Sequence, residues 1–233
     1  MQSMTKSVFI SRDQDEFSEF STLLHAAAWQ VSGSSLVALT PLPVEAVPEA
    51  DWIFFASKNA VRFFFEGIGW MVEDTNPVFA SILWAALGPA TARELLRYTH
   101  RVDFTGSGDP AGTATAFLPI ARGKRVLFPA ARHSQQSIAR LLGDAITALH
   151  LAVYDNAPLA DPPRLDESIL VFTSPMNARA YFARHSLQTH QRVVAIGQTT
   201  ASALKVLGIK NAVMPKEPTE AALADTVLAM MAG

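Results

Sequence analysis

The sequence has 233 residues, a length that suits one large domain or two small ones. Hydrophobic residues make up 49% of the chain and charged residues 17%, which supports a buried core and excludes a disordered protein. A formal net charge of −2 argues against a surface for nucleic acid or anionic membranes, because both need clustered lysine and arginine. The absence of cysteine excludes disulfides and thiolate metal sites.

The N-terminal residues MQSMTKSVFI lack the basic stretch, the long apolar segment and the cleavage site of a secretory signal. Apolar runs such as Trp52 to Ala56 are far shorter than a membrane span. We therefore expect a cytoplasmic protein that binds neither membranes nor nucleic acids.

Short apolar runs bounded by polar residues recur along the chain and are typical of buried strands in a parallel sheet. They lie at Val8–Ser11, Trp52–Ala56, Trp84–Leu87, Arg125–Phe128, Ile169–Phe172 and Val193–Ile196. A segment with helical spacing follows each run. After the first run, Phe17, Phe20, Leu23 and Leu24 recur with the period of one helix face. The alternation predicts an α/β protein with doubly wound parallel sheets.

Three segments of the first half of the chain resemble three of the second half. The matched pairs are A (Val8–Leu24) with A′ (Val126–Leu142), B (Phe55–Phe65) with B′ (Phe172–Phe182), and C (Ala85–Leu96) with C′ (Val194–Leu207). Both copies of B have a Phe, a Ser two residues later and an Asn-Ala pair that opens an aromatic-rich helix. The constant order favours duplication of a half-molecule, and generic α/β similarity is the alternative.

Two β-prone segments, Ser34–Leu42 and Ala145–Pro158, follow A and A′ and do not fit a strand–helix unit. Because they occupy equivalent places, they can pair with each other as a two-stranded hinge. The alternative is that they are ordinary strands at the edges of sheets.

Together these segments resemble the uroporphyrinogen-III synthase family over nearly the whole chain. The resemblance rests on the order and spacing of ISR, FASKNAV, ALGPATA, AVYDNAP, FTSPMNARAYF, AIGQTTASAL and KEPTEAALA. It implies two doubly wound parallel-sheet lobes joined by a two-stranded β linker, with residues 1–35 and 157–233 in one lobe and 36–156 in the other. It also implies that A packs with B′ and C′.

The resemblance further implies a cyclising hydro-lyase of haem biosynthesis that needs no cofactor. The family's substrate, the linear tetrapyrrole hydroxymethylbilane, loses its terminal hydroxyl as water and closes with the terminal pyrrole ring inverted. Without an enzyme the same substrate closes to the symmetric isomer, so catalysis consists largely of holding a flexible polycarboxylate in one geometry. We expect a monomer that makes transient contact with the upstream bilane-forming enzyme.

A slightly acidic protein cannot bind a polycarboxylate through a basic patch alone. Helix N-termini offer unpaired backbone N–H groups to anions, and in open α/β sheets they lie at the carboxyl ends of the strands. Polar residues in these turns fit this binding role and fit equally well the alternative of helix N-caps. The candidates are Ser57, Asn59, Thr91, Ser174, Asn177, Gln198, Thr199, Thr200 and Thr219.

Three basic residues are candidates for contact with the substrate. Lys58 can pair with a carboxylate, with an ordinary surface lysine as the alternative, and Arg12 matches an N-terminal arginine of the family. Arg132 lies in FPAARHS, where the family carries its arginine directly after the proline. Here Ala130 and Ala131 intervene.

Tyr154 matches the tyrosine that the family carries just after the second linker strand, and we expect it to act in the chemistry. A phenol with a pKa of about 10 stays neutral at pH 7 and can donate a hydrogen bond to the departing hydroxyl. The alternative is a tyrosine packed at a lobe boundary. Thr199 matches a family threonine and is the second catalytic candidate, with helix capping as its alternative.

Other chemistries lack their motifs. The six histidines have no metal-binding spacing, so no metal site is expected. GSGDPAG (Gly106–Gly112) lacks the spacing of a dinucleotide loop, which disfavours a flavodoxin-like or dinucleotide enzyme. The remaining alternative is a non-catalytic, two-lobed protein that binds or senses a small molecule. Tyr154 and the turn at Lys58 weigh against it.

Overall fold

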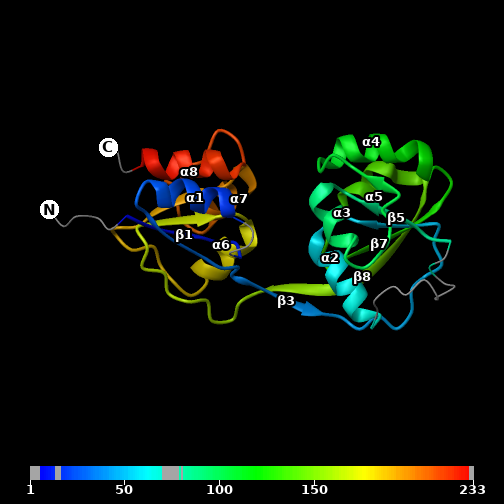
Figure 1. The fold of residues 1–233 in the computed structure, drawn as a ribbon. Coiled ribbons are helices and arrows are strands. Elements are labelled where there is room, and N and C mark those ends of the chain that lie inside the picture. Colours follow the sequence, from blue (N-terminus) through cyan, green and yellow to red (C-terminus); the bar gives the residue numbers. More distant parts are fainter. Residues whose placement is uncertain (1–5, 14–16, 70–78, 80, 231–233) are drawn as a thin grey trace. The chain divides into compact units, whose positions relative to one another are not determined.

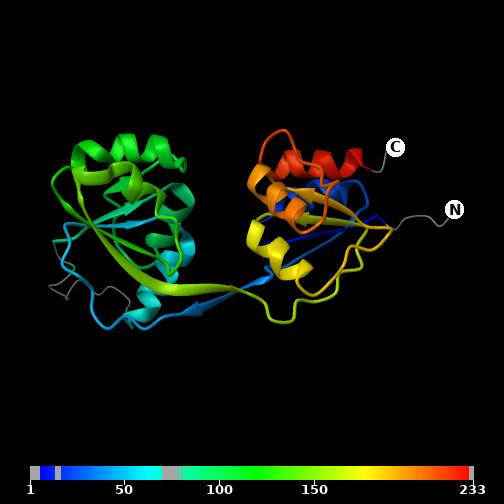
Figure 2. The ribbon, with the colours of Figure 1, turned by 180° about the vertical axis from the view of Figure 1, so that it is seen from behind.

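The computed structural model describes residues 6–13, 17–69, 79 and 81–230. The chain forms two compact units, and each has its own sheet and core. Unit 1 combines Met1–Ala38 with Ala157–Gly233, and unit 2 is Leu39–Asn156. Figures 1 and 2 show the strands and helices of each unit from opposite sides.

The sheet of unit 2 has the strand order β3-β8-β7-β4-β5-β6. Its strands are β3 (Val37–Pro41), β4 (Trp52–Phe55), β5 (Leu83–Ala86), β6 (Phe104–Thr105), β7 (Arg125–Ala131) and β8 (Thr147–Pro158). The strands from β8 to β6 pair in parallel. The chain runs outward from β4 to β6 and then returns to β7 on the other side of β4. The strand order therefore reverses between β4 and β7, a point where open α/β sheets bind ligands.

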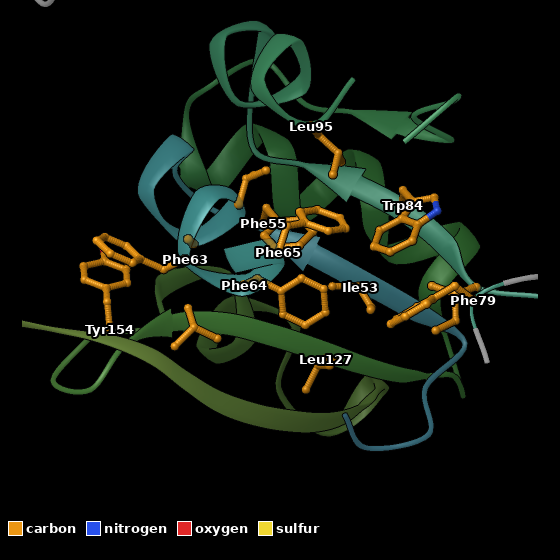
Figure 3. Packing of buried hydrophobic residues seen from close by; sticks show 14 residues of the cluster. Ile53, Phe55, Phe63, Phe64, Phe65, Phe79, Trp84, Leu95, Leu127 and Tyr154 are labelled. Atoms are coloured by element: carbon orange, nitrogen blue, oxygen red, sulfur yellow. The ribbon is translucent and has the colours of Figure 1, made fainter. Parts of the chain in front are cut away.

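Both faces of β4 are buried, which explains why its sequence WIFF shows no polar alternation. Ile53 and Phe55 pack in one core with α2 (Lys58–Gly67) and α3 (Pro89–Leu95). Trp52 and Phe54 pack in a second core with α4 (Pro110–Ala121) and α5 (Ser137–Leu142), which a short helical turn, η2 (Gly143–Ala145), follows. Figure 3 shows the first core, in which Phe63, Phe64 and Phe65 of α2 lie among the strand residues.

Unit 1 has the strand order β10-β9-β1-β2, with β1 (Ser7–Ile10), β2 (Gln30–Gly33), β9 (Ile169–Phe172) and β10 (Arg192–Ala195). Val213, which belongs to none of these strands, forms a parallel bridge with Val194 of β10. One core lies under α1 (Ser18–Ala26) and α8 (Glu220–Ala229), and the other under α6 (Pro175–Phe182) and α7 (Gln198–Val206). This unit is doubly wound like unit 2.

The two sheets are built from exchanged copies of the repeat. β1 belongs to segment A and pairs with β9 of B′, which pairs in turn with β10 of C′. This pairing confirms the prediction that A packs with B′ and C′. In unit 2, β7 of A′ pairs with β4 of B in the same way, and β4 pairs with β5 of C.

The chain passes between the units through β3 and β8, and these two strands are neighbours in one sheet. The Leu159 N–H donates to the Leu36 carbonyl at 2.9 Å, and the Leu42 N–H donates to the Val153 carbonyl at 3.0 Å. The two segments therefore run antiparallel. The predicted pairing of the linker segments is confirmed, and β3 is at the same time the edge strand of the sheet in unit 2.

All six strands predicted from the apolar runs are present, with small shifts at their ends. The prediction that Phe17, Phe20, Leu23 and Leu24 share the buried face of the first helix is wrong for Leu23. Phe20 and Leu24 are buried one turn apart in the core shared with α8, whereas Leu23 is 40% exposed. Leu23 is rotated by about 100° from Leu24 around the helix axis and therefore leaves that face. Within the described residues, no helix has the length and apolarity needed to cross a membrane.

Candidate functional site

A pocket of about 240 Å³ opens in unit 2 beside the reversal between β4 and β7. Its walls come from the carboxyl ends of three strands and include Phe54, Leu87 and Phe128. The approach to α5 adds the polar side chains of Gln135 and Gln136. The pocket is therefore an apolar hollow with a polar border, at the place where this fold binds ligands.

Tyr154 lies on β8 at the same edge of the sheet and is 9% exposed. Its ring stacks on the ring of Phe63 in α2, with centroids 5.0 Å apart and planes at 24° (Figure 3). Burial raises the pKa of the Tyr154 phenol, and a hydrogen bond with the side chain of Ser57 acts in the opposite direction. A phenol is protonated at neutral pH even at its ordinary pKa, and the net upward shift extends this to higher pH, so Tyr154 can donate a hydrogen bond.

Ser57 places this hydrogen bond at the start of α2. It is the N-cap residue of the helix, and its Oγ accepts from the Ala60 N–H at 3.1 Å. Ala56, the residue before it, lines the pocket. Tyr154 belongs to the core on the α2 side, whereas Phe54 and Phe128 of the pocket belong to the core on the α5 side. The phenol and the pocket thus lie at one sheet edge on opposite faces.

Arg132 follows β7 and is tied to the strand that carries Tyr154. Its N–H donates to the Tyr154 carbonyl at 2.9 Å, and its guanidinium pairs with the Asp155 carboxylate at 3.0 Å. About half of the arginine side chain remains exposed. The two extra alanines of FPAARHS therefore leave a basic group beside Tyr154, although a neighbouring carboxylate already neutralises it.

Three further candidates of unit 2 lie in its strand-to-helix turns. Lys58 is exposed in the first turn of α2, and Asn59 beside it is half-buried. Thr91 lies in the first turn of α3 but is 7% exposed. Its side chain therefore contributes to packing more than to a surface that a ligand can reach.

The corresponding edge of unit 1 holds a polar pair between β1 and β9. The Ser11 Oγ accepts from the Thr173 N–H at 2.9 Å, and the Thr173 hydroxyl donates to the Ser11 carbonyl at 2.8 Å. Arg12 follows Ser11 directly and is half-buried. Unit 1 thus has hydrogen-bonding hydroxyls where unit 2 has an apolar pocket.

Ser174 and Asn177 in unit 1 are bound to each other. Ser174 caps α6, and its Oγ accepts from both the N–H and the Nδ2 of Asn177, at 3.1 and 2.9 Å. The Asn177 Oδ1 accepts from the buried Leu36 N–H at 2.7 Å. Asn177 is itself buried, so its amide holds the turn together.

At the start of α7, Gln198 and Thr199 are exposed and Thr200 is buried. The Gln198 Nε2 donates to the Ser202 Oγ at 3.3 Å on the same helix. Thr200 takes the place in α7 that Thr91 takes in α3, two residues after the first of the helix, and both are buried. Thr199, the catalytic candidate, is the member of this turn that a ligand can reach.

The N-cap interpretation is confirmed for Ser57, Ser174 and Thr219, whose side chains accept from backbone N–H groups. It is wrong for Thr91, Thr199 and Thr200, because Gly88 and Gly197 occupy the cap positions without a side-chain bond. It is also wrong for Asn59 and Asn177, which lie inside the first turns of their helices.

Three residues around Tyr154 were not predicted in their observed roles: Phe63, which stacks on its ring; Asp155, which pairs with Arg132; and Ser57, whose side chain affects the pKa of the phenol. The sequence around Phe63 predicts a buried residue, but it does not show which strand the aromatic ring will contact. Asp155 could have been identified, because it is an acidic residue directly after the predicted tyrosine. Within the described part of the chain, no three acidic or histidine side chains are grouped to hold a metal ion.

The model of the family described as uroporphyrinogen-III synthase HemD matches residues 18–225. The uroporphyrinogen-III synthase of Chlorobaculum parvum is 27% identical over 198 residues, which are 74% of this chain and 80% of that protein. The chloroplastic uroporphyrinogen-III synthase of Oryza sativa subsp. japonica is 30% identical over 185 residues, which are 72% of this chain and 59% of that protein.

Solved structures share the fold. The crystal structure of uroporphyrinogen-III synthetase from Helicobacter pylori aligns with a TM-score of 0.68 at 23% identity, and covers 97% of this chain and 100% of its own. A mutant uroporphyrinogen III synthase from Thermus thermophilus aligns with a TM-score of 0.54 at 20% identity, and covers 97% of this chain and 99% of its own.

Proposed function

The chain belongs to the uroporphyrinogen-III synthase family, and we propose that it converts hydroxymethylbilane into uroporphyrinogen III with loss of water and inversion of the terminal ring. The observation that carries the proposal is the position of Tyr154. Its ring stacks on Phe63 at the sheet edge where doubly wound folds bind ligands, and its phenol is protonated at neutral pH, with a pKa that burial raises further. A protonated donor is what the departing hydroxyl of this substrate needs.

In the proposed reaction, Tyr154 donates a hydrogen bond to the terminal hydroxyl of the bilane as its C–O bond breaks. The hydroxyl leaves as water with the proton of the adjacent pyrrole nitrogen, so Tyr154 is unchanged and an electrophilic azafulvene remains. The far pyrrole ring attacks through a substituted carbon, and the resulting spiro intermediate fragments and recloses with that ring inverted. The protein's main task is to hold the bilane in the conformation that allows this attack.

We propose two kinds of role for the polar residues at the sheet edges. Direct contacts with substrate carboxylates come from residues whose side chains are exposed or half-buried: Arg12, Lys58, Asn59, Arg132, Ser174, Gln198 and Thr199. The remaining residues shape the turns whose backbone N–H groups bind anions: Ser57, Thr91, Asn177 and Thr200. In unit 2, the pocket beside Phe54 and Phe128 is suited to an apolar ring face of the substrate.

We further propose that the protein acts as a cytoplasmic monomer that receives its substrate in transient contact with the bilane-forming enzyme. The chain has no cysteine, as suits a reducing compartment. Handover from the upstream enzyme would shorten the time in which the bilane closes by itself. Light scattering of the purified protein tests the monomer, which has a mass of 25.2 kDa, against a dimer of twice that mass.

The test of the function is a product analysis. Freshly prepared hydroxymethylbilane is incubated with the purified protein, the products are oxidised, and the porphyrin isomers are separated. We expect the type III isomer in excess. Type I alone, at the rate of a blank without protein, would contradict the proposal and favour a protein that only binds such molecules.

A further inference from the structure

A pocket of about 670 Å³ lies in unit 1 at the edge strand of its sheet. β10 is the outer strand, and Arg192 and Val193 at its start line the pocket together with residues 208–211, which follow α7. α7 begins with the candidate residues Gln198 and Thr199, whereas the pocket lies beyond the last residue of this helix. The pocket therefore belongs to a part of unit 1 that the proposed reaction does not use.

The chain leaves part of the sheet edge uncovered here because it turns away at Gly208. This residue has a φ of +88°, which suits glycine, and its N–H donates to the Lys205 carbonyl at 3.1 Å as α7 ends. The chain returns to the sheet at Val213, whose N–H donates to the Val193 carbonyl at 3.0 Å. The Val213 carbonyl in turn accepts from the Ala195 N–H at 2.9 Å. Val213 thus covers the edge of β10 from the Val193 carbonyl onward and leaves the N–H of Val193 uncovered.

Val193 offers an unpaired N–H group at the pocket. Its carbonyl points to the sheet edge, where it accepts from Val213, and the N–H and carbonyl of one strand residue point to the same side. Among the described residues, no group accepts from this N–H, although Val193 is only 2% exposed. Buried N–H groups are nearly always paired, so this one favours an acceptor supplied from outside the chain.

Two cations, Arg192 and Lys210, border the same pocket. The Arg192 guanidinium donates to the Met230 carbonyl through Nη1, which leaves most of its N–H groups available. Lys210 is exposed. Within the described residues, neither cation forms an ion pair with a carboxylate. Two such cations beside an unpaired N–H group favour an anionic ligand.

Much of the remaining wall is apolar. Leu187 and Ile209 pack against the core under α6 and α7, and Met230 packs against the core under α1 and α8. The pocket therefore spans the edge of the sheet from one face to the other. Val213 is 40% exposed beside it. A small inorganic anion would leave these side chains in contact with water, whereas a ligand with an apolar body would cover them.

We propose that this pocket binds an amphipathic carboxylate, a molecule with an apolar body and a carboxylate head group. The carboxylate accepts from the Val193 N–H and the Arg192 guanidinium, and Lys210 adds a second positive charge. The apolar body covers Ile209 and Val213. The binding site does not depend on the proposed reaction, because no residue of the candidate site takes part in it.

The test uses two fluorescent probes that share one apolar ring system. Pyrenebutanoate carries a carboxylate, and pyrenebutanol has the same ring and chain without the charge. In a fluorescence titration of the purified protein at neutral pH, pyrenebutanoate should bind saturably, with a Kd about tenfold lower than that of pyrenebutanol, the equivalent of one charged hydrogen bond. Acetate should not displace it, because acetate lacks the apolar body. Equal affinity for the two probes, or no saturable binding, would overturn the inference.

Substitutions locate the bound probe. Arg192→Gln removes the positive charge, keeps a donor for the Met230 carbonyl, and should raise the Kd of pyrenebutanoate about tenfold. Lys210→Gln should raise it about threefold, and the variant keeps the fold because this lysine is exposed. Lys216→Gln, which removes an exposed lysine outside the pocket, is the matched control and should leave the Kd unchanged. Binding that neither Arg192→Gln nor Lys210→Gln weakens would place the probe elsewhere and overturn the inference.

The amide of Val193 gives a direct readout of the head group. In protein labelled with ¹⁵N-valine, its signal, assigned by its loss in Val193→Ile, should move as pyrenebutanoate binds, because the N–H gains a charged acceptor. The same signal should move much less with pyrenebutanol. A Val193 signal that stays in place when the protein is saturated with pyrenebutanoate would contradict the proposed contact.

Discussion

The ring of Tyr154 lies against the ring of Phe63, with centroids 5.0 Å apart and planes at 24°. The two residues are far apart in the sequence, and they meet because β8 lies beside β7 in the sheet of unit 2 while α2 packs in the core that also holds Tyr154. This contact buries the Tyr154 ring, which is 9% exposed, and fixes its plane.

Tyr154→Phe should reduce turnover strongly while it changes the free energy of unfolding by only about 1 kcal/mol, because the stack with Phe63 remains and one hydrogen bond is lost. Initial rates of type III formation and urea denaturation measure the two effects. A variant that turns over at the wild-type rate would leave Tyr154 as a packing residue.

Phe63→Leu should reduce turnover and also destabilise unit 2, because it removes the stacking surface and leaves a space in a core where Phe63 is 4% exposed. Aromatic pairs contribute about 0.5–1.5 kcal/mol beyond their buried area, so we expect a loss of about 1–3 kcal/mol. The comparison is Phe64→Leu, which alters the same core without touching Tyr154. Equal losses of turnover in the two variants would show that the stack has no specific role.

Substitutions of Arg132 and Asp155 should have opposite effects on substrate binding. Arg132→Ala removes a basic contact and should raise KM, whereas Asp155→Asn releases the guanidinium from its 3.0 Å ion pair and should lower KM. Neither change should alter stability by more than about 1 kcal/mol, since both side chains are partly exposed. Steady-state kinetics at fixed ionic strength decides the matter, and a rise in KM for both variants would contradict the proposed contact.

Asn177→Ala should affect stability more than binding. The change leaves the buried Leu36 N–H without its 2.7 Å acceptor, which costs about 1–3 kcal/mol. Asn59→Ala, at a half-buried position in α2, is the comparison and should cost less than about 0.5 kcal/mol. Thermal unfolding of both variants tests this, and an Asn177→Ala protein of wild-type stability would show that the Leu36 contact is dispensable.

Burial of three tyrosine side chains predicts how the stability and activity of the protein depend on pH. Burial raises the pKa of Tyr98, Tyr154 and Tyr181. Because these pKa values are higher in the folded than in the unfolded chain, their contribution to stability is complete below about pH 10 and is lost as the pH rises through the folded values. Urea denaturation between pH 8 and 11 should show this loss. Ionisation of Tyr154 should not reduce turnover below about pH 9. If turnover falls below about pH 9 in the wild-type protein and this fall is absent in Tyr154→Phe, the raised pKa of Tyr154 would be contradicted.

The sequence predicted the architecture well because strands and repeats leave local signals. Fully apolar runs such as WIFF at Trp52–Phe55 mark strands buried on both faces, and the order of segments A, B and C reveals the duplication. The pairing of Ser34–Leu42 with Ala145–Pro158 followed from their equivalent places in the repeat. The exchange of A between the units came from family resemblance, since no residue of β1 specifies which copy of B it meets.

The site was less predictable because its contacts join distant elements. Ser57 and Ser174 look alike in sequence, yet only Ser174 accepts from a side chain of its own helix, because the residue three positions after the cap is Asn177 in one copy and Ala60 in the other. The burial of Thr91 and Thr200 depends on how each helix is rotated against its sheet. Candidate residue types were therefore found, while their division into caps, packing residues and exposed ligands required the structure.

The most direct measurement of the central claim is the ratio of type III to type I porphyrin as a function of protein concentration. Spontaneous closure of hydroxymethylbilane to type I competes with the catalysed reaction, so the ratio reports turnover against a constant background. We expect the ratio to rise in proportion to the wild-type protein and much less steeply with Tyr154→Phe. A ratio that stays at the spontaneous value at every protein concentration would contradict the assignment of this chain as a uroporphyrinogen-forming cyclase.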